Sequence, residues 1–76
     1  MPERNRWEDQ ASNLLKAELK RRGVSYAQLV ERLAALGIAE DEKNIRNKLS
    51  RGKFTAAYLL QCLEAIGCSS LRLQSD

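Results

Sequence analysis

The chain has 76 residues and 43% hydrophobic content, which suits one small folded domain and excludes a fully disordered chain. Its formal net charge of +3 is compatible with an anionic partner but does not require one. No apolar run approaches the roughly 20 residues of a membrane span, and the N-terminus has no signal-type apolar segment, so we expect a cytoplasmic protein without membrane insertion.

The residue types do not point to enzyme chemistry. The chain has two cysteines and no histidine, and Cys62 and Cys68 do not form a C-x-x-C motif. It also lacks a glycine-rich phosphate loop, and the sequence spacing reveals no nucleophile with a nearby base. We therefore expect a protein that is not an enzyme and that uses no metal, no cofactor and no small-molecule ligand.

The composition favours helices, because one proline, at position 2, and four glycines leave long uninterrupted stretches. Residues 1–6 are polar and are predicted to form a flexible N-terminal tail. A first helix is predicted over residues 7–22, ended by Gly23. Its apolar stripe consists of Trp7, Ala11, Leu14, Leu15 and Leu19, with Trp7 expected as a lid on the core.

A second helix is predicted to follow Ser25, a suitable N-cap, and to end at Gly37. Ile38, in the turn after Gly37, is expected to pack into the core. The buried face of this helix is predicted to contain Leu29, Leu33 and Leu36.

A third helix is predicted between Asp41, a good N-cap, and Gly52, a good C-terminal stop. Ile45 and Leu49 lie four residues apart and make a narrow apolar face opposite a broad polar one. From residue 43 to residue 53 the cations are Lys43, Arg46, Lys48, Arg51 and Lys53, with no acid between them. Such groups suit phosphates and base edges, although a charge run on a short helix is also typical of a solvated face.

Thr55 is predicted to cap a fourth helix that ends at Gly67. Its buried stripe is expected to comprise Leu59, Leu63 and Ile66 with Ala56 and Leu60, and Cys62 is expected at the edge of that stripe. Each predicted helix thus ends at a glycine, which is typical of a bundle of short helices with short connections. The fold class is therefore predicted to be all-α, in one domain over residues 7–68.

Residues 69–76 form a different kind of segment, a short extended C-terminal tail in which Leu71 and Leu73 alternate with polar residues. One interpretation is a strand that pairs with the same strand of a second copy and makes a homodimer. The other is a loose tail whose leucines pack back onto the domain.

The second and third helices, joined by a tight turn, are predicted to form a helix-turn-helix. In that motif the later helix enters the major groove while the earlier one crosses the backbone. The candidate base contacts are Lys43, Asn44 and Asn47, because asparagine suits adenine and lysine suits guanine. The candidate phosphate contacts are Arg46, Arg51 and Lys53, together with Ser25 and Tyr26 at the start of the second helix.

The order of elements resembles the phage-repressor-like helix-turn-helix domains over residues 14–68. The matching residues are Leu29, Leu33, Leu36-Gly37-Ile38, Ile45 and Arg51-Gly52-Lys53. This resemblance implies a four- to five-helix domain that binds operator-like DNA, often as a dimer. Tyr26 stands where that family usually has a phosphate-contacting glutamine. The chain also resembles, over most of its length, a small bacterial family of stand-alone proteins with no established function.

Two functions follow from these patterns. The first is sequence-specific binding of double-stranded DNA by a small bacterial or phage-type transcriptional regulator. The alternative is a repressor-like protein-interaction module, such as an antitoxin or adaptor, that binds a protein partner. Glu40, Asp41 and Glu42 favour the alternative slightly, because they would lie near phosphates, although helix capping also explains acids at this place.

Overall fold

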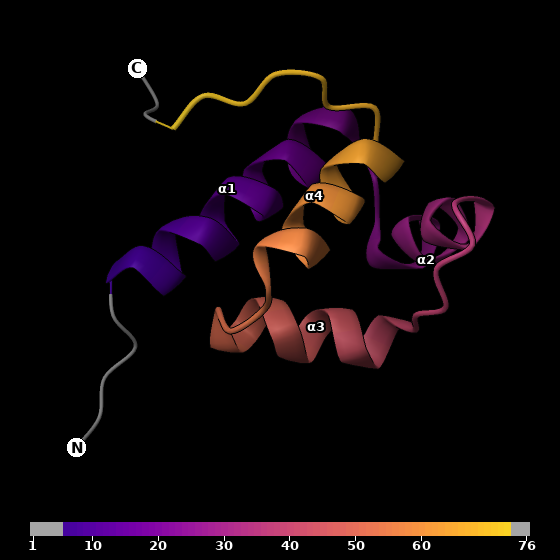
Figure 1. The fold of residues 1–76 in the computed structure, drawn as a ribbon, viewed down its shortest axis with the longest axis horizontal. Helices are drawn as coiled ribbons and strands as arrows, with labels where there is room; N and C mark the ends of the chain where they lie inside the picture. The colour runs from indigo at the N-terminus through magenta and orange to yellow at the C-terminus, as the bar shows by residue number, and fades with distance from the viewer. Residues whose placement is uncertain (1–5, 74–76) are drawn as a thin grey trace.

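The structure, a computed structural model, describes residues 6–73 and is all-helical, with no strand in that range. Its four helices are α1 (Arg6–Arg22), α2 (Tyr26–Ala35), α3 (Glu42–Arg51) and α4 (Ala56–Ala65), as Figure 1 shows. The predicted helices are therefore all present, and α1 begins one residue earlier than expected. The rest of the predicted N-terminal tail lies outside the described residues.

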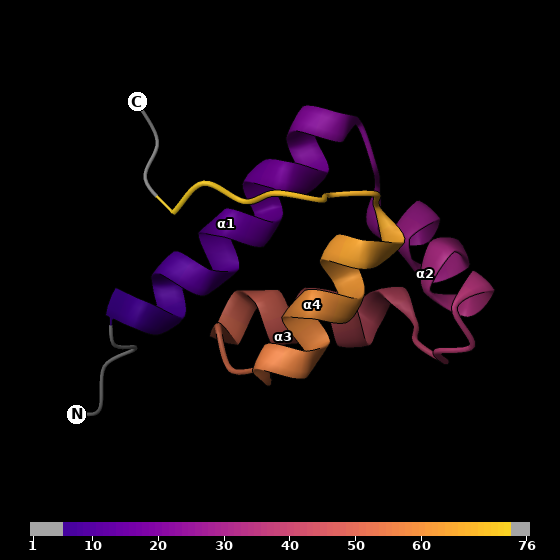
Figure 2. The ribbon, with the colours of Figure 1, turned by 45° about the horizontal axis from the view of Figure 1, so that its top comes forward.

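The four helices form a bundle in which α1 and α4 lie side by side and α3 runs across one end of them (Figures 1 and 2). Both α3 and α4 pack against α1 and against α2. This arrangement leaves one long side of α3 facing away from the rest of the bundle. No helix within residues 6–73 has both the length and the apolar character needed to cross a bilayer.

Local capping sets three of the helix starts as predicted. Ser25, Asp41 and Thr55 each have extended backbone angles, and each side chain accepts a hydrogen bond from the N–H three residues further on. At the end of α3, Gly52 has a φ of 69°, a left-handed conformation that other residues adopt only with strain. Its N–H donates to the Lys48 carbonyl at 2.9 Å, which closes the last turn.

The core lies where the four helices meet. Ile38, Phe54 and Leu71 pack against it and are partly buried, as expected for Ile38. The buried apolar residues are Leu15, Leu19, Val24, Leu29, Leu33, Ile45, Leu49, Tyr58, Cys62, Leu63 and Ile66.

Three predictions about the core are wrong. Trp7 is 64% exposed, because the first turn of α1 projects past the other helices; its ring lies against the Arg6 guanidinium rather than over the core. Leu36 is 46% exposed at the C-cap of α2. In α4 the buried face differs from the predicted one, because Ala56 and Leu60 are exposed while Tyr58 and Cys62 are buried.

The segment after α4 runs back along α1 (Figure 2). The Cys68 N–H donates to the Leu63 carbonyl at 2.9 Å, and the Gln10 side chain donates to the Leu73 carbonyl at 3.2 Å. Leu71 packs on the core, whereas Leu73 is 65% exposed. Pairing of this segment with a second copy stays a prediction, and residues 74–76 lie outside the described residues.

Candidate nucleic-acid interface

The outward side of α3 is polar because only two residues of this helix are apolar, and both face the core. Ile45 and Leu49 are both fully buried, and they hold α3 against the bundle. The predicted contact residues on this helix, Lys43, Asn44, Arg46, Asn47 and Arg51, are all exposed. The side chains on α3 that were predicted to contact DNA therefore lie on the surface.

An open depression of about 280 Å³ lies on α3 and the turn that follows it. Two asparagine amides and three cationic groups line it, and no carboxylate does. The lining residues are Asn44, Asn47, Lys48, Arg51 and Lys53. The fold therefore brings together four of the eight predicted contact residues and adds Lys48. Lys43 and Arg46 lie on α3 outside the lining of this depression, and Ser25 and Tyr26 lie at the start of α2.

The start of α2 is a complete capping box. The Ser25 hydroxyl accepts from the Gln28 N–H at 3.1 Å, and the Gln28 side chain accepts from the Ser25 N–H at 2.9 Å. Ser25 thus has a full structural role, and its hydroxyl keeps a hydrogen that can donate to a phosphate. Tyr26 is half-buried and packs against the core, so it is less available than predicted.

Several cations of the α3 region are paired with acids, which the sequence patterns did not identify. Arg46 lies 3.8 Å from Glu42, and Lys53 lies 3.9 Å from Glu8 at the start of α1. These pairs are largely exposed and contribute little stability, on the order of 0–1 kcal/mol each. They do lower the net positive charge of the surface.

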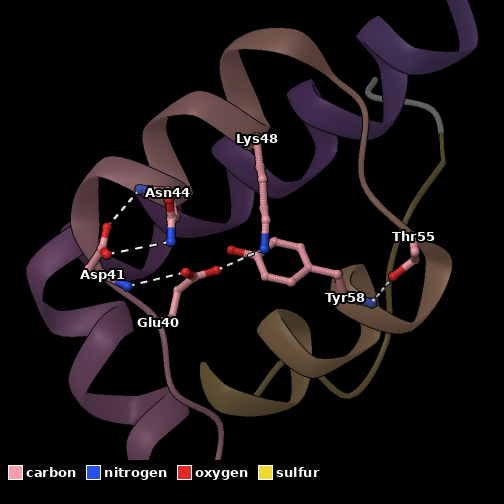
Figure 3. Close-up of polar contacts among 6 residues, drawn as sticks. All are labelled: Glu40, Asp41, Asn44, Lys48, Thr55 and Tyr58. Carbon is pink, nitrogen blue, oxygen red and sulfur yellow. Dashed lines mark hydrogen bonds and ion pairs between the residues drawn. The ribbon is translucent and has the colours of Figure 1, made fainter.

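The third pair, between Glu40 and Lys48, is more enclosed (Figure 3). The Glu40 side chain is only 5% exposed; one carboxylate oxygen accepts from the Lys48 ammonium at 3.1 Å and the other from the Asp41 N–H at 3.1 Å. Burial alone would raise the pKa of Glu40, but the Lys48 ammonium and nearby donors hold this pKa below its ordinary value. The pair ties the turn between α2 and α3 to the middle of α3.

Lys48 also contacts α4, because its ammonium lies 4.1 Å from the centre of the Tyr58 ring. The Tyr58 hydroxyl is buried and makes no hydrogen bond among the described residues, although Cys62 and Glu40 lie close to it. Burial, together with these two neighbours, raises the pKa of Tyr58 well above its ordinary value. Tyr58 is therefore neutral and serves as an aromatic support for Lys48.

A buried hydrogen bond that sequence reasoning missed holds the far end of α3. The Ser12 hydroxyl of α1 donates to the Leu49 carbonyl, and both residues are fully buried. The last carbonyls of a helix have no partner within it, so this bond satisfies one of them. Ser12 shares the helical spacing of Leu15 and Leu19, and that register is the signal that places it on the buried face.

Comparison with known proteins gives one match. The family described as a domain of unknown function, DUF6471, matches residues 7–71. The chain belongs to the DUF6471 family. No curated protein and no solved structure matches it. In this DUF6471 chain the matched range includes α2, α3, α4 and nearly all of α1, together with the following segment up to Leu71, so that the family unit coincides with the folded bundle.

The chemistry available on α3 of this DUF6471 domain is that of polar recognition. Asparagine amides both donate and accept hydrogen bonds, while lysine and arginine only donate and carry charge. Such a surface suits an anionic ligand that also presents hydrogen-bonding edges.

Proposed function

We propose that this protein binds double-stranded DNA in a sequence-specific manner, as a small transcriptional regulator. On this proposal α2, the turn over residues 36–41 and α3 act as a helix-turn-helix, with α3 in the major groove and α2 across the backbone. The observation that carries the proposal is the depression on α3, where asparagine amides lie beside Lys48, Arg51 and Lys53.

The dimensions of α3 support this proposal. Its ten residues extend about 15 Å at roughly 1.5 Å per residue, and a major groove about 12 Å wide admits one α-helix. The two fully buried residues, Ile45 and Leu49, lie on the side opposite the polar surface, so docking into a groove needs no rearrangement of the core.

The charge distribution defines where phosphates would bind. Acids cluster at the start of α3, whereas Arg51 and Lys53 lie at its end. The proposal therefore assigns the backbone contacts mainly to Lys53, after the C-terminal end of α3, and to Ser25 at the capped start of α2.

The test is selection from a random-sequence duplex pool at two salt concentrations, with sequencing of the retained fraction. We expect an enriched motif and an affinity that falls as salt rises, with a log–log slope of about −0.9 for each phosphate contact. A palindromic motif would support a homodimer, because two-fold protein symmetry matches two-fold DNA symmetry.

The variant for this test is Arg46→Glu/Arg51→Glu, and its matched control is Lys16→Glu/Lys20→Glu on the exposed side of α1. Both change the net charge equally, so long-range repulsion is the same. We expect the α3 variant to lose binding while it keeps helical circular dichroism, and the α1 variant to bind more tightly than the α3 variant. Equal losses in the two variants would contradict a binding site on α3.

A second candidate function is binding of a protein partner by the same surface. It is supported by the acids that pair with Arg46, Lys48 and Lys53, since they reduce the attraction for a polyanion. Absence of retention on the duplex pool even at low salt would favour this alternative over DNA binding.

A further inference from the structure

The outward side chains of α3 fall into two groups, according to whether they already contact another side chain of the protein. In the first group each side chain already has a partner within the protein (Figure 3 shows two of the three pairs). The pairs are Asn44 with Asp41 (3.4 Å between Nδ2 and Oδ2), Arg46 with Glu42 (3.8 Å) and Lys48 with Glu40 (3.1 Å).

The second group consists of Lys43, Asn47 and Arg51, which we name the outer stripe. All three are exposed, and none of their side chains makes a hydrogen bond or ion pair with any residue within 6–73. They recur at a spacing of four residues, so they follow one another along one side of α3. Their donors are therefore available to a ligand without breaking an existing contact.

The stripe also occupies the most outward position on the helix. At about 100° per residue, Asn47 lies roughly 180° from the direction midway between Ile45 and Leu49, the two residues that face the core. Lys43 and Arg51 lie within about 40° of Asn47 on either side. The paired side chains lie at larger angles from Asn47 around the helix axis, closer to the bundle. They are Asn44, Arg46 and Lys48.

The length and chemistry of the stripe suit base edges. It extends about 12 Å from Lys43 to Arg51, which corresponds to three or four base pairs at about 3.4 Å each. An asparagine can bond the N6 and N7 atoms of adenine together, and arginine or lysine can bond O6 and N7 of guanine.

We propose that Lys43, Asn47 and Arg51 are the specificity-determining residues, reading adenine through Asn47 and guanine through Lys43 and Arg51 in the major groove. This inference rests on the proposed DNA binding. It moves Arg51 from the predicted phosphate contacts to the base contacts. It also moves Asn44 from the base contacts to a structural role beside the Asp41 cap.

The experiment repeats the duplex-pool selection with Asn47→Ala, Arg51→Gln and Asn44→Ala, alongside the wild type. Asn44→Ala is the matched control, because it removes the same amide from the same helix three residues away. Arg51→Gln replaces a side chain that pairs with guanine by one that pairs with adenine, so loss of a base contact changes the motif, whereas loss of a phosphate contact weakens binding to all sequences about equally. Circular dichroism and Tm of each variant confirm that it is folded.

We expect Asn47→Ala to lose the preference at one adenine position, with discrimination there falling by roughly 5- to 150-fold. Arg51→Gln should lose a guanine preference and gain an adenine preference at the same position, and Asn44→Ala should enrich the wild-type motif. The inference is overturned if Asn44→Ala changes the motif while Asn47→Ala does not, or if Arg51→Gln leaves the motif unchanged. No retention of the wild type would overturn the proposed function itself, and the inference with it.

Discussion

Replacement of Ser12 by alanine should destabilise the domain through α3. The substitution removes one hydroxyl and leaves the Leu49 carbonyl buried without a donor, because both residues are fully buried and water cannot replace the lost bond. Such an unsatisfied group costs about 1–3 kcal/mol. A domain of 76 residues has a total stability of only about 4–11 kcal/mol, at roughly 0.05–0.15 kcal/mol per residue. The expected loss of stability is therefore a large part of the total free energy of unfolding.

Urea denaturation followed by circular dichroism measures this loss, and Ser69→Ala, at an exposed serine, is the matched control. Each kcal/mol should lower the Tm by about 4–8 °C in a domain of this size, so a decrease of at least about 4 °C is expected for Ser12→Ala alone. If Ser12→Ala stays within about 0.5 kcal/mol of Ser69→Ala, the hydroxyl does not tie α3 to α1 and the assignment of this bond is refuted.

Three further predictions follow from the contacts around α3 and α4. Because the pKa of Glu40 is lower in the folded protein than in the unfolded chain, its stabilising contribution is present above the unfolded pKa and is lost as the pH falls through the folded value. Glu40→Gln should therefore be less stable than wild type at pH 7, with the difference shrinking toward pH 3 in urea titrations; a difference that does not vary with pH would contradict this. Thr55→Ala should cost about 0.5–2 kcal/mol through loss of the α4 cap, while Thr55→Ser should retain most of the stability. Burial raises the pKa of Cys62 to about 11, so iodoacetamide at pH 8 should label Cys62 only at the rate of unfolding, as read by mass spectrometry. Rapid labelling of Cys62 in the folded protein would show that the thiol is accessible.

The helix boundaries were predictable because the interactions that set them are local. Ser25, Asp41 and Thr55 each bond an N–H three residues away, and Gly52 adopts its left-handed conformation within the same turn. These contacts need no partner from elsewhere in the chain. The narrow apolar face of α3 was predictable for a related reason, since only two of its ten residues are apolar and they lie four apart.

The buried face of α4 was not predictable in the same way. Its sequence AAYLLQC is apolar almost all round, so helical periodicity cannot decide which side faces the core. The packing of α4 against both α1 and α2 buries Tyr58 and Cys62 and leaves Leu60 exposed. Likewise, nothing in the sequence pairs Glu8 with Lys53, because the two are brought together only by the fold.

The sequence by itself determined that this is a bundle of four short helices whose third helix has a polar outer face. The physical reason is that caps, glycine stops and helical spacing act over three or four residues. Only the tertiary structure decided that Lys48 and Lys53 are paired, because Glu40 and Glu8 reach them through the fold. It also decided that Ser12 is a core residue, since a buried hydroxyl is tolerated only where another helix supplies its acceptor.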